Sequence, residues 1–395
     1  MTDEKATSLG YLSGIRTVVE LELRQRVRSK SWFIMLVVWF LVILAVTALA
    51  AYSASPMLLG TAEAEQIGQM MFELVISFVL LFGLLVAPAL SANTITGDRA
   101  GGTLAILQNT LLTPGQLLWG KWLASWIAAL AFLVVTLPML AWAMSYGDVY
   151  LPSVPLFVLM CAVELGVACA IGVGISARST RPLFAVVGTY LVVALLGLGT
   201  LIGFGLSLSM TQETITDYEV VNPKDPYASI EMDENGVPLD EDGEPVENEE
   251  QFWREFDAEH ADFVYRTEDE ICTDKPIQRT ILHTERTAWM LAANPFVVVA
   301  DAVATQPVEA GQDYSPEGPL GAVQVGVRMA QYGVDGPDCV NGVRQPEPTM
   351  NPGEMPPLWP VGLGVQLVLV GLLMADGRRR LVTPARKLAT GTRVA

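Results

Sequence analysis

The chain has 395 residues, of which 51% are hydrophobic, and it carries 24 Lys+Arg against 42 Asp+Glu. The acidic excess is confined to residues 208–356, which hold 31 Asp+Glu against 8 Lys+Arg, whereas the rest of the chain holds 11 against 16. So high a hydrophobic share beside a long polar stretch excludes an ordinary soluble domain. It predicts a membrane protein with a large acidic insert.

The N-terminal segment 1–31 is polar and ends in a basic amphipathic pattern. Between residues 14 and 31, apolar side chains are interleaved with Arg24, Arg26 and Arg28. A basic amphipathic helix beside a membrane usually lies in the interface. The apolar run that follows is too long for a cleavable signal peptide, so we interpret it as the first span, with the N-terminus in the cytoplasm.

Six apolar segments have about the 20 residues that a helix needs to cross a bilayer. They are residues 32–52, 70–92, 117–144, 154–177, 183–208 and 357–375. We therefore predict an all-α integral membrane domain of six transmembrane helices, preceded by an amphipathic elbow helix. Spans one to five lie within 32–207, the acidic domain 208–356 separates span five from span six, and a basic tail follows at 376–395.

The distribution of basic residues predicts the orientation of these spans. Outside the insert, Lys and Arg lie before span one, between spans two and three, between spans four and five, and after span six. The two remaining loops, 53–69 and 145–153, contain no Lys or Arg. The positive-inside rule then places both termini in the cytoplasm and the insert outside, in a plasma (inner) membrane.

A rival topology would make residues 287–304 a further span. That segment is fairly apolar, but it holds Asn294-Pro295 in its middle and Asp301 near its end. Both features are poor choices for a lipid-facing helix, and a span here would move the basic tail outside. We expect a short re-entrant or interfacial helix pair on the outer face instead.

The insert itself gives weaker signals. Residues 217–275 are dense in acidic residues and turn signals, which predicts loose structure or short hairpins, and a more structured part is expected at 276–340. Cys272 and Cys339 lie in the insert, where disulfides persist, so we expect a bridge between them, with two free buried thiols as the alternative. Cys161 and Cys169, in span four, are expected to be packed thiols.

The loop 93–121, between spans two and three, is unusually long. Gly101-Gly102 interrupts any helix that extends from span two, and Pro114-Gly115 breaks the chain again before span three. A short helix over 103–110, held between two breakers at the membrane surface, suits a docking element. An ordinary polar connector is the alternative.

The residues of this loop carry a family resemblance. An acidic–Arg pair precedes Gly-Thr-Leu, and a Thr-Pro element and a Gly-Lys pair then lead into the third span. With the six spans, this pattern resembles the permeases of the ABC-2 type (type-2 ABC) exporters. The chain departs from that family in having Ala105 where an acidic residue often stands, and in its much larger outer domain. The matching positions are Asp98, Arg99, Gly102, Thr103, Leu104, Leu107, Thr110, Thr113, Pro114, Gly120 and Lys121.

The resemblance implies a permease subunit that moves a hydrophobic or amphipathic substrate, such as a lipid, drug or peptide, outward. It implies two copies of a separate ATPase that hold ATP and Mg, and a second permease chain in a homodimer or heterodimer. The chain itself is then neither an enzyme nor a cofactor carrier, and it contacts membrane lipid but no nucleic acid. The residues implied to dock the ATPase are Asp98, Arg99, Thr103, Leu104, Leu107 and Thr110.

The different-class alternative is a membrane-anchored sensor or assembly protein that acts through its outer domain. A nucleotide site in this chain is rejected, because the P-loop-like run 115–121 lacks a preceding strand and a following Ser or Thr. No metal site is expected either. The run 231–242 only loosely imitates a calcium loop, and His260 and His283 lack partners at zinc spacing.

Polar residues inside spans are candidates for a translocation path. Glu164 lies near the middle of span four, where a carboxyl group is costly unless it is protonated, paired or facing water. It either lines a cavity that contacts substrate or a proton, or makes a helix–helix hydrogen bond. Gln366 in span six is the second candidate, with interhelical hydrogen bonding as its alternative. Glu73, at the outer end of span two, is expected to snorkel to water.

Overall fold

The computed structural model describes residues 10–53, 67–104, 112–303, 318–333, 337–345 and 356–381, apart from gaps at 148, 234–235, 240–242, 247, 265 and 267–268. In that part of the chain, six helices are long and apolar enough to cross a membrane. The predicted all-α membrane domain is therefore confirmed. The spans are α2 (Lys30–Ser53), α4 (Ile67–Ser91), α7 (Pro114–Met144), α8 (Ser153–Arg178), the continuous α9 (Pro182–Ala194), η2 (Leu195–Gly199) and α10 (Thr200–Leu208), and α14 (Trp359–Leu381).

The chain forms two compact units. The first, here called the membrane unit, comprises Met1–Ser207, Glu285–Tyr332 and Asn351–Ala395, and the second, the insert unit, comprises Leu208–Thr284 and Gly333–Met350. The predicted acidic domain 208–356 is thus divided between them. Its apolar middle part belongs with the spans because it buries valine and alanine side chains against them.

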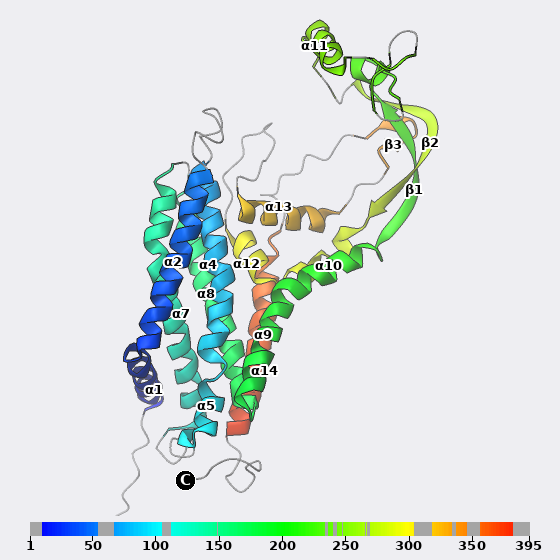
Figure 1. The fold of residues 1–395 in the computed structure, drawn as a ribbon. Helices are drawn as coiled ribbons and strands as arrows, with labels where there is room; N and C mark the ends of the chain where they lie inside the picture. The colour runs from blue at the N-terminus through cyan, green and yellow to red at the C-terminus, as the bar shows by residue number, and fades with distance from the viewer. Residues whose placement is uncertain are drawn as a thin grey trace, which may run out of the picture. The chain divides into compact units, whose positions relative to one another are not determined.

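The membrane unit is built around α8. In α8, 72% of the most apolar 18-residue stretch is buried, compared with 11% in the fifth span. Its core brings together Phe72 and Ile76 of α4, Phe132 of α7 and Phe157 of α8. Trp39 of α2 packs edge-on against Phe132 and donates a hydrogen bond to its carbonyl at 3.1 Å. Burial of these large side chains holds α2, α4, α7 and α8 side by side (Figure 1).

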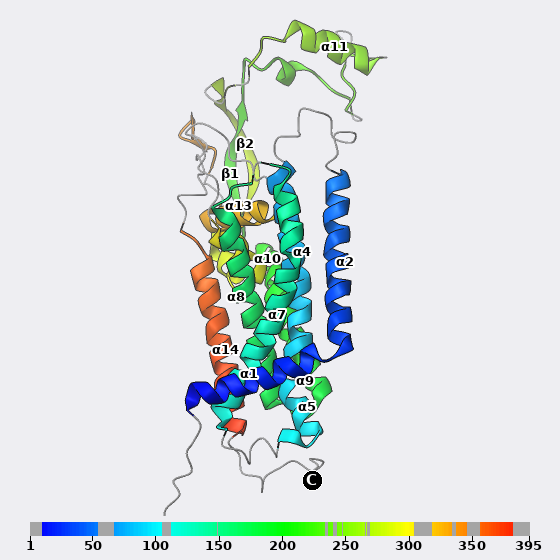
Figure 2. The same ribbon diagram turned by 90° about the vertical axis from the view of Figure 1, so that its left-hand side faces the viewer.

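Short helices close each end of this bundle. At one end, α1 (Tyr11–Val27) lies across the spans and α5 (Thr94–Ala100) follows span two, as Figure 2 shows. At the opposite end lie η6 (Ala288–Leu291), α12 (Pro295–Ala302) and α13 (Pro319–Tyr332). The segment 287–304 therefore forms two short helices rather than a span, as its proline and aspartate predicted.

The insert unit is organised by a long two-stranded ribbon. Strand β1 (Gln212–Val221) pairs antiparallel with β2 (Ile271–Leu282), and the register shifts between Tyr218 and Val220. The connection between them carries η3 (Pro226–Ser229) and α11 (Glu249–Glu259). A small hairpin, β3 (Cys339–Val340) with β4 (Val343–Arg344), lies against the ribbon. The structure is thus more regular than the turn signals predicted.

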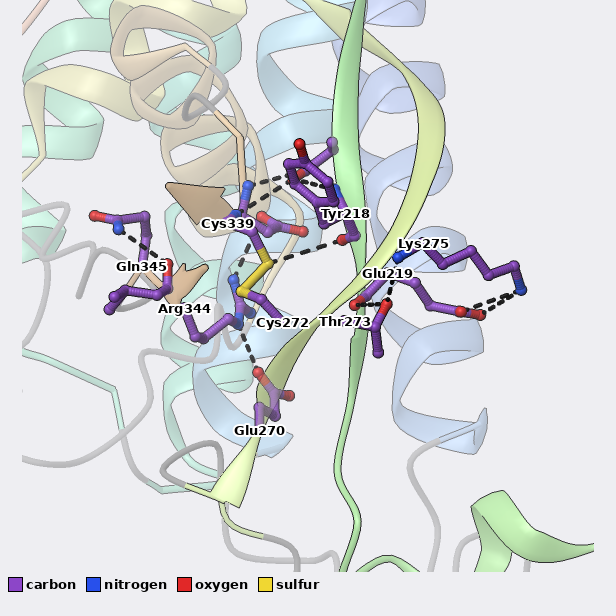
Figure 3. The surroundings of a disulfide bond; sticks show 12 residues. Tyr218, Glu219, Glu270, Cys272, Thr273, Lys275, Cys339, Arg344 and Gln345 are labelled. Carbon is purple, nitrogen blue, oxygen red and sulfur yellow. Dashed lines mark hydrogen bonds and ion pairs between the residues drawn. A yellow bond between two sulfur atoms is a disulfide. The ribbon is translucent and has the colours of Figure 1, made fainter. Parts of the chain in front are cut away.

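A disulfide joins the hairpin to the ribbon (Figure 3). It links Cys272 of β2 with Cys339 of β3, the pairing expected from the sequence, with a Cα–Cα distance of 6.0 Å. Beside it, Arg344 of β4 pairs with Glu270 at 2.6 Å. Cys161 and Cys169, by contrast, are free and buried in α8.

Asp217 of β1 fixes the same hairpin through its carboxylate. This side chain is buried and accepts hydrogen bonds from the backbone N–H groups of Asp338 (2.9 Å), Cys339 (3.3 Å) and Tyr218 (2.8 Å). Burial raises the pKa of Asp217, but these N–H groups and Arg279 outweigh that effect and hold its pKa below the usual value. A depressed pKa means that the ionised carboxylate stabilises the folded insert.

We therefore predict that the insert unit loses stability as the pH falls below about 4, the ordinary aspartate value, because protonation removes the preferred acceptor. Asp217→Asn should open the β3–β4 hairpin already at neutral pH and flatten this acid dependence. Hydrogen–deuterium exchange of β1 and β3 in the full-length protein measures both effects. The matched control is Asp274→Asn on the exposed side of β2. Equal exchange in the two variants would contradict the role of Asp217.

Candidate functional site

A buried ammonium group joins three helices at the end of the bundle that carries α5. Lys121, in the first turns of α7, is 1% exposed. Its Nζ lies 2.5 Å from a carboxylate oxygen of Glu22 on α1 and 2.7 Å from one of Asp98 on α5. Burying an ammonium group without a partner is strongly unfavourable, and the two carboxylates offset that cost. We call Lys121, Glu22 and Asp98 the Lys121 triad.

Helix α1 is fixed on α7 by close backbone approach as well as by charge. A Cβ atom at Gly120 would lie 2.6 Å from the Cβ atom of Val18 and 3.3 Å from the Ile15 carbonyl oxygen, so this position requires glycine. The far end of α1 is tied to α4, because the guanidinium of Arg26 donates to the Leu90 carbonyl at 2.8 Å. Helix α1 is therefore in contact with two spans, α4 and α7.

Helix α5 is held in turn by the end of α8. The hydroxyl of Ser176 accepts hydrogen bonds from the backbone N–H groups of Ile95 and Thr96, both at 3.1 Å. Arg99 donates to the carbonyl oxygens of Ser179 and, at 3.3 Å, Ala177. These bonds satisfy donors and acceptors at two helix ends that would otherwise be unpaired. They also connect the loop after span two to span four.

The other predicted docking residues fall into three groups. Thr103 is exposed and donates to the Asp98 carbonyl at 3.2 Å. Leu104 is 6% exposed and packs in a cluster with Ile95, Leu118 and Met374, so its side chain faces the chain's own interior. Leu107 and Thr110 lie outside the described residues, as does most of the helix predicted over 103–110.

The sequence analysis missed α5 itself and the carboxylate partner on α1. Helix α5 ends at the Gly101-Gly102 pair, where Gly102 has φ +76°, so the chain breaks where the sequence predicted, and an additional turn at 92–93 separates α5 from α4. Glu22 gave no signal, because one acidic residue on an amphipathic helix is ordinary. Its role depends on Lys121, which lies 99 residues away in the chain.

The two candidate path residues lie together. Glu164 of α8 and Gln366 of α14 are 1% and 0% exposed, and their side chains lie near each other between the two spans. The Gln366 amide also donates to the Ala293 carbonyl at 3.1 Å. Among the described residues, one oxygen of each side chain has no hydrogen-bond partner. This pair joins spans four and six within one chain, which is the arrangement expected for an interhelical contact.

At the α12 end, the expectation that Glu73 snorkels to water is wrong. Glu73 is 5% exposed, and its carboxylate accepts hydrogen bonds from the backbone N–H groups of Leu320 (3.0 Å) and Gly321 (2.9 Å). The side chain therefore caps the first turn of α13, where unpaired N–H groups favour negative charge. Sequence reasoning missed this because the capped helix is 247 residues away.

A second carboxylate at this end joins three helices. Asp301 of α12 is 2% exposed and pairs with Arg328 of α13 at 2.8 Å. Its other oxygen accepts from the backbone N–H groups of Leu358 (2.5 Å) and Trp359 (2.9 Å), at the start of α14. Asp301, whose charge makes a membrane span over this segment unfavourable, thus holds the start of span six.

Comparison with known protein families agrees with the geometry. A family model described as ABC-2 family transporter protein matches residues 16–231, which is more than half of the chain. The chain belongs to the ABC-2 transporter family. The matched range runs from within α1 through all five spans before the insert, and the three residues of the Lys121 triad lie inside it. No curated protein and no solved structure matches this ABC-2 transporter chain.

We predict that Lys121→Met destabilises this ABC-2 protein by about 1–3 kcal/mol, less than the loss of a fully buried pair, because the side chains of Glu22 and Asp98 keep 18% and 27% of their exposure to solvent. Adding Glu22→Gln and Asp98→Asn should restore much of the loss, because the unpaired charges are then removed. Thermal unfolding in detergent measures the change. Lys224→Met, at an exposed ion pair in the insert unit, serves as the matched control and should have little effect. A Lys121→Met variant as stable as the control would rule out a structural triad.

For the Glu164–Gln366 pair we predict that Glu164→Leu lowers stability by about 1–3 kcal/mol, because Gln366 then loses a buried partner. Glu164→Gln keeps the volume and one hydrogen bond, and should be nearly neutral. Substrate-stimulated ATPase activity of the complex separates packing from a path role. If Glu164→Gln is stable yet changes that stimulation, the residue lines the path, and if stimulation is unchanged, it is a packing contact.

Proposed function

We propose that this chain is the permease subunit of an ATP-driven exporter, which works with a separate ATPase at the end of the bundle that carries α5. The family supports a transmembrane component that has no catalytic activity of its own and an ATPase partner. The observation that carries the proposal is the Lys121 triad. The triad connects α5, which precedes the docking loop, to α1 and to α7. A displacement of that loop would therefore move α5, α1 and α7 together.

The α5 end is the cytoplasmic one in this proposal. Described basic residues gather there on α1, α5 and the ends of α8 and α14, including Arg26, Arg99, Arg178 and Arg380. Positive charge favours the cytoplasmic side of short loops. The Cys272–Cys339 disulfide supports an extracytoplasmic insert, because such bonds persist in oxidising compartments. Both termini are then cytoplasmic and the membrane is the plasma (inner) membrane.

Transmission is proposed to run through two rigid connections. ATP binding closes two ATPase subunits, which hold ATP and Mg in their own sites, and the closure displaces the loop that contains Thr103, Leu107 and Thr110. The Lys121 triad passes the displacement to α1 and α7. Ser176 and Arg99 pass it to α8, the most buried span. Coupling through packed, bistable elements of this kind is general in switching proteins.

The proposed substrate is hydrophobic or amphipathic, and the apolar surface of the spans supports this class. Exposed apolar side chains line α2, α9, η2 and α10, including Phe33, Val37, Leu191 and Leu198. Such surfaces contact lipid or a second permease chain, in a homodimer or heterodimer, and they suit a hydrophobic or amphipathic substrate such as a lipid, drug or peptide. The proposed direction is outward.

A sensor or assembly protein remains the second candidate, and the insert unit favours it. This unit has its own ribbon, disulfide and buried Asp217, which is more than a loop between spans needs. The two candidates differ in what the ATPase requires. An exporter subunit stimulates the turnover of a copurifying ATPase, and a sensor that acts only through its insert does not.

We predict that Arg99→Gln separates binding of the ATPase from transport. The variant loosens α5 from α8 without placing a charge in the buried cluster, as Leu104→Asp would. The ATPase should still copurify, whereas permease-dependent ATP turnover should fall by about tenfold, the effect of losing roughly 1.4 kcal/mol of coupling. Copurification and turnover are measured in proteoliposomes.

The matched control is Arg181→Gln, which removes an arginine beside the first turn of α9 that stacks over Phe184. It should leave turnover at the wild-type level. Equal turnover in Arg99→Gln and Arg181→Gln would contradict transmission through α5. Absence of any ATPase that depends on this chain would instead favour the sensor.

A further inference from the structure

The connection between β1 and β2 carries an unusual combination of acidic charge and aromatic rings. Residues 222–270 hold 18 Asp+Glu against 3 Lys+Arg, a net charge of −15. Two of the three basic residues are already paired, Lys224 with Asp269 at 2.5 Å and Arg254 with Glu250 at 3.8 Å. The charge of this connection is therefore largely uncompensated by basic side chains of its own.

Aromatic rings follow one face of α11 within this acidic segment. Phe252, Trp253 and Phe256 stand at helical spacing, and Phe256 stacks on His260 with ring centroids 4.2 Å apart. Tyr227 of η3 meets Phe256 at 5.1 Å and donates its hydroxyl to Asp257 at 2.9 Å. We call these five rings the α11 aromatic face.

This face is not a buried core. No described residue of α11 is buried, its three rings are half-buried, and Tyr227 is 41% exposed. A helix with an aromatic stripe normally buries that stripe against a neighbour. Rings that keep this much access to solvent, with carboxylates beside them, form a surface that is complementary to a cation and to apolar groups at once.

Charge discriminates among the possible occupants. A second copy of this chain would bring the same negative charge against this surface, which repels it. A lipid surface is also disfavoured, because helices that bind membranes carry Lys and Arg on their polar face, and α11 has five acidic residues against Arg254. A ligand that carries both positive charge and apolar side chains can pair with the carboxylates and contact the aromatic rings.

We propose that the α11 aromatic face binds cationic amphipathic peptides, with its rings contacting apolar and cationic side chains and the surrounding carboxylates pairing with Lys or Arg. The binding surface belongs to the insert unit and does not require the chain to be an exporter. If the exporter proposal also holds, such peptides become a substrate or a signal of the transporter.

The test measures binding alone, with the full-length protein in nanodiscs of zwitterionic phosphatidylcholine. The probe is a fluorescein-labelled peptide of Leu and Lys, about 14 residues long so that it can form an amphipathic helix. Fluorescence anisotropy, corrected for empty nanodiscs, should show saturable binding. Binding should weaken strongly as salt is raised from about 50 to 500 mM, since the Debye length shrinks.

Variants locate the site. Trp253→Ala with Phe256→Ala should weaken binding by about tenfold or more, the loss expected for truncated aromatic anchors. Glu255→Gln with Glu259→Gln keeps every ring and should weaken binding while reducing its salt dependence. Trp289→Ala, which removes a ring that is 64% exposed in the membrane unit, is the matched control and should bind as the wild type does.

The outcomes are decisive in both directions. An intact Cys272–Cys339 bridge, seen by gel mobility, shows that each variant retains the fold of the insert unit. The proposal is overturned if both double variants bind like Trp289→Ala, or if a Leu–Glu analogue of the peptide binds equally well. It is also overturned if binding equals that of empty nanodiscs, or if the aromatic variant changes only self-association, which would assign the face to a second copy.

Discussion

The arrangement at the α5 end depends on one buried ammonium group. Two carboxylates from different helices reach the buried Lys121 ammonium and offset the cost of its burial, and each of those helices is thereby fixed in position. The close approach of α1 and α7 at Gly120 adds a second contact between the same two helices. The loop after span two therefore begins at α5, a helix whose position these contacts fix.

At the opposite end of the bundle the short helices are also held by buried charges, but there the buried groups are carboxylates rather than an ammonium group. There Asp301 and Glu73 are buried carboxylates, and the positive partners are Arg328 and the unpaired backbone N–H groups at helix starts. Each charge connects segments that are far apart in the chain. Ion pairs and capped helix ends therefore hold the short helices to the spans at both ends, while apolar packing holds the spans to one another.

The sequence predicted those parts of the fold that depend on local composition. Apolar length identified six spans, the Asn294-Pro295 pair with Asp301 ruled out another, and the location of Cys272 and Cys339 indicated their bridge. Contacts between distant segments were not predictable in this way. The roles of Glu22 and Glu73 depend on Lys121 and on α13, and nothing in the neighbouring residues indicates those partners. Leu104 illustrates the same limit, because a motif position cannot say whether a side chain faces outward or inward.

The fifth span contains a turn of π-helix, η2, where the carbonyl of Gly197 accepts a hydrogen bond from the Asn294 side chain at 2.8 Å. The same amide contacts Thr200 at 2.9 Å, while its oxygen caps α12. A π turn holds one residue more than an α turn. If it relaxed to α-helix, every side chain of α10 would rotate by about 100° relative to α9, the angle of one helical residue. Asn294, which lies outside the span, therefore holds the turn on which the orientation of the α10 side chains depends.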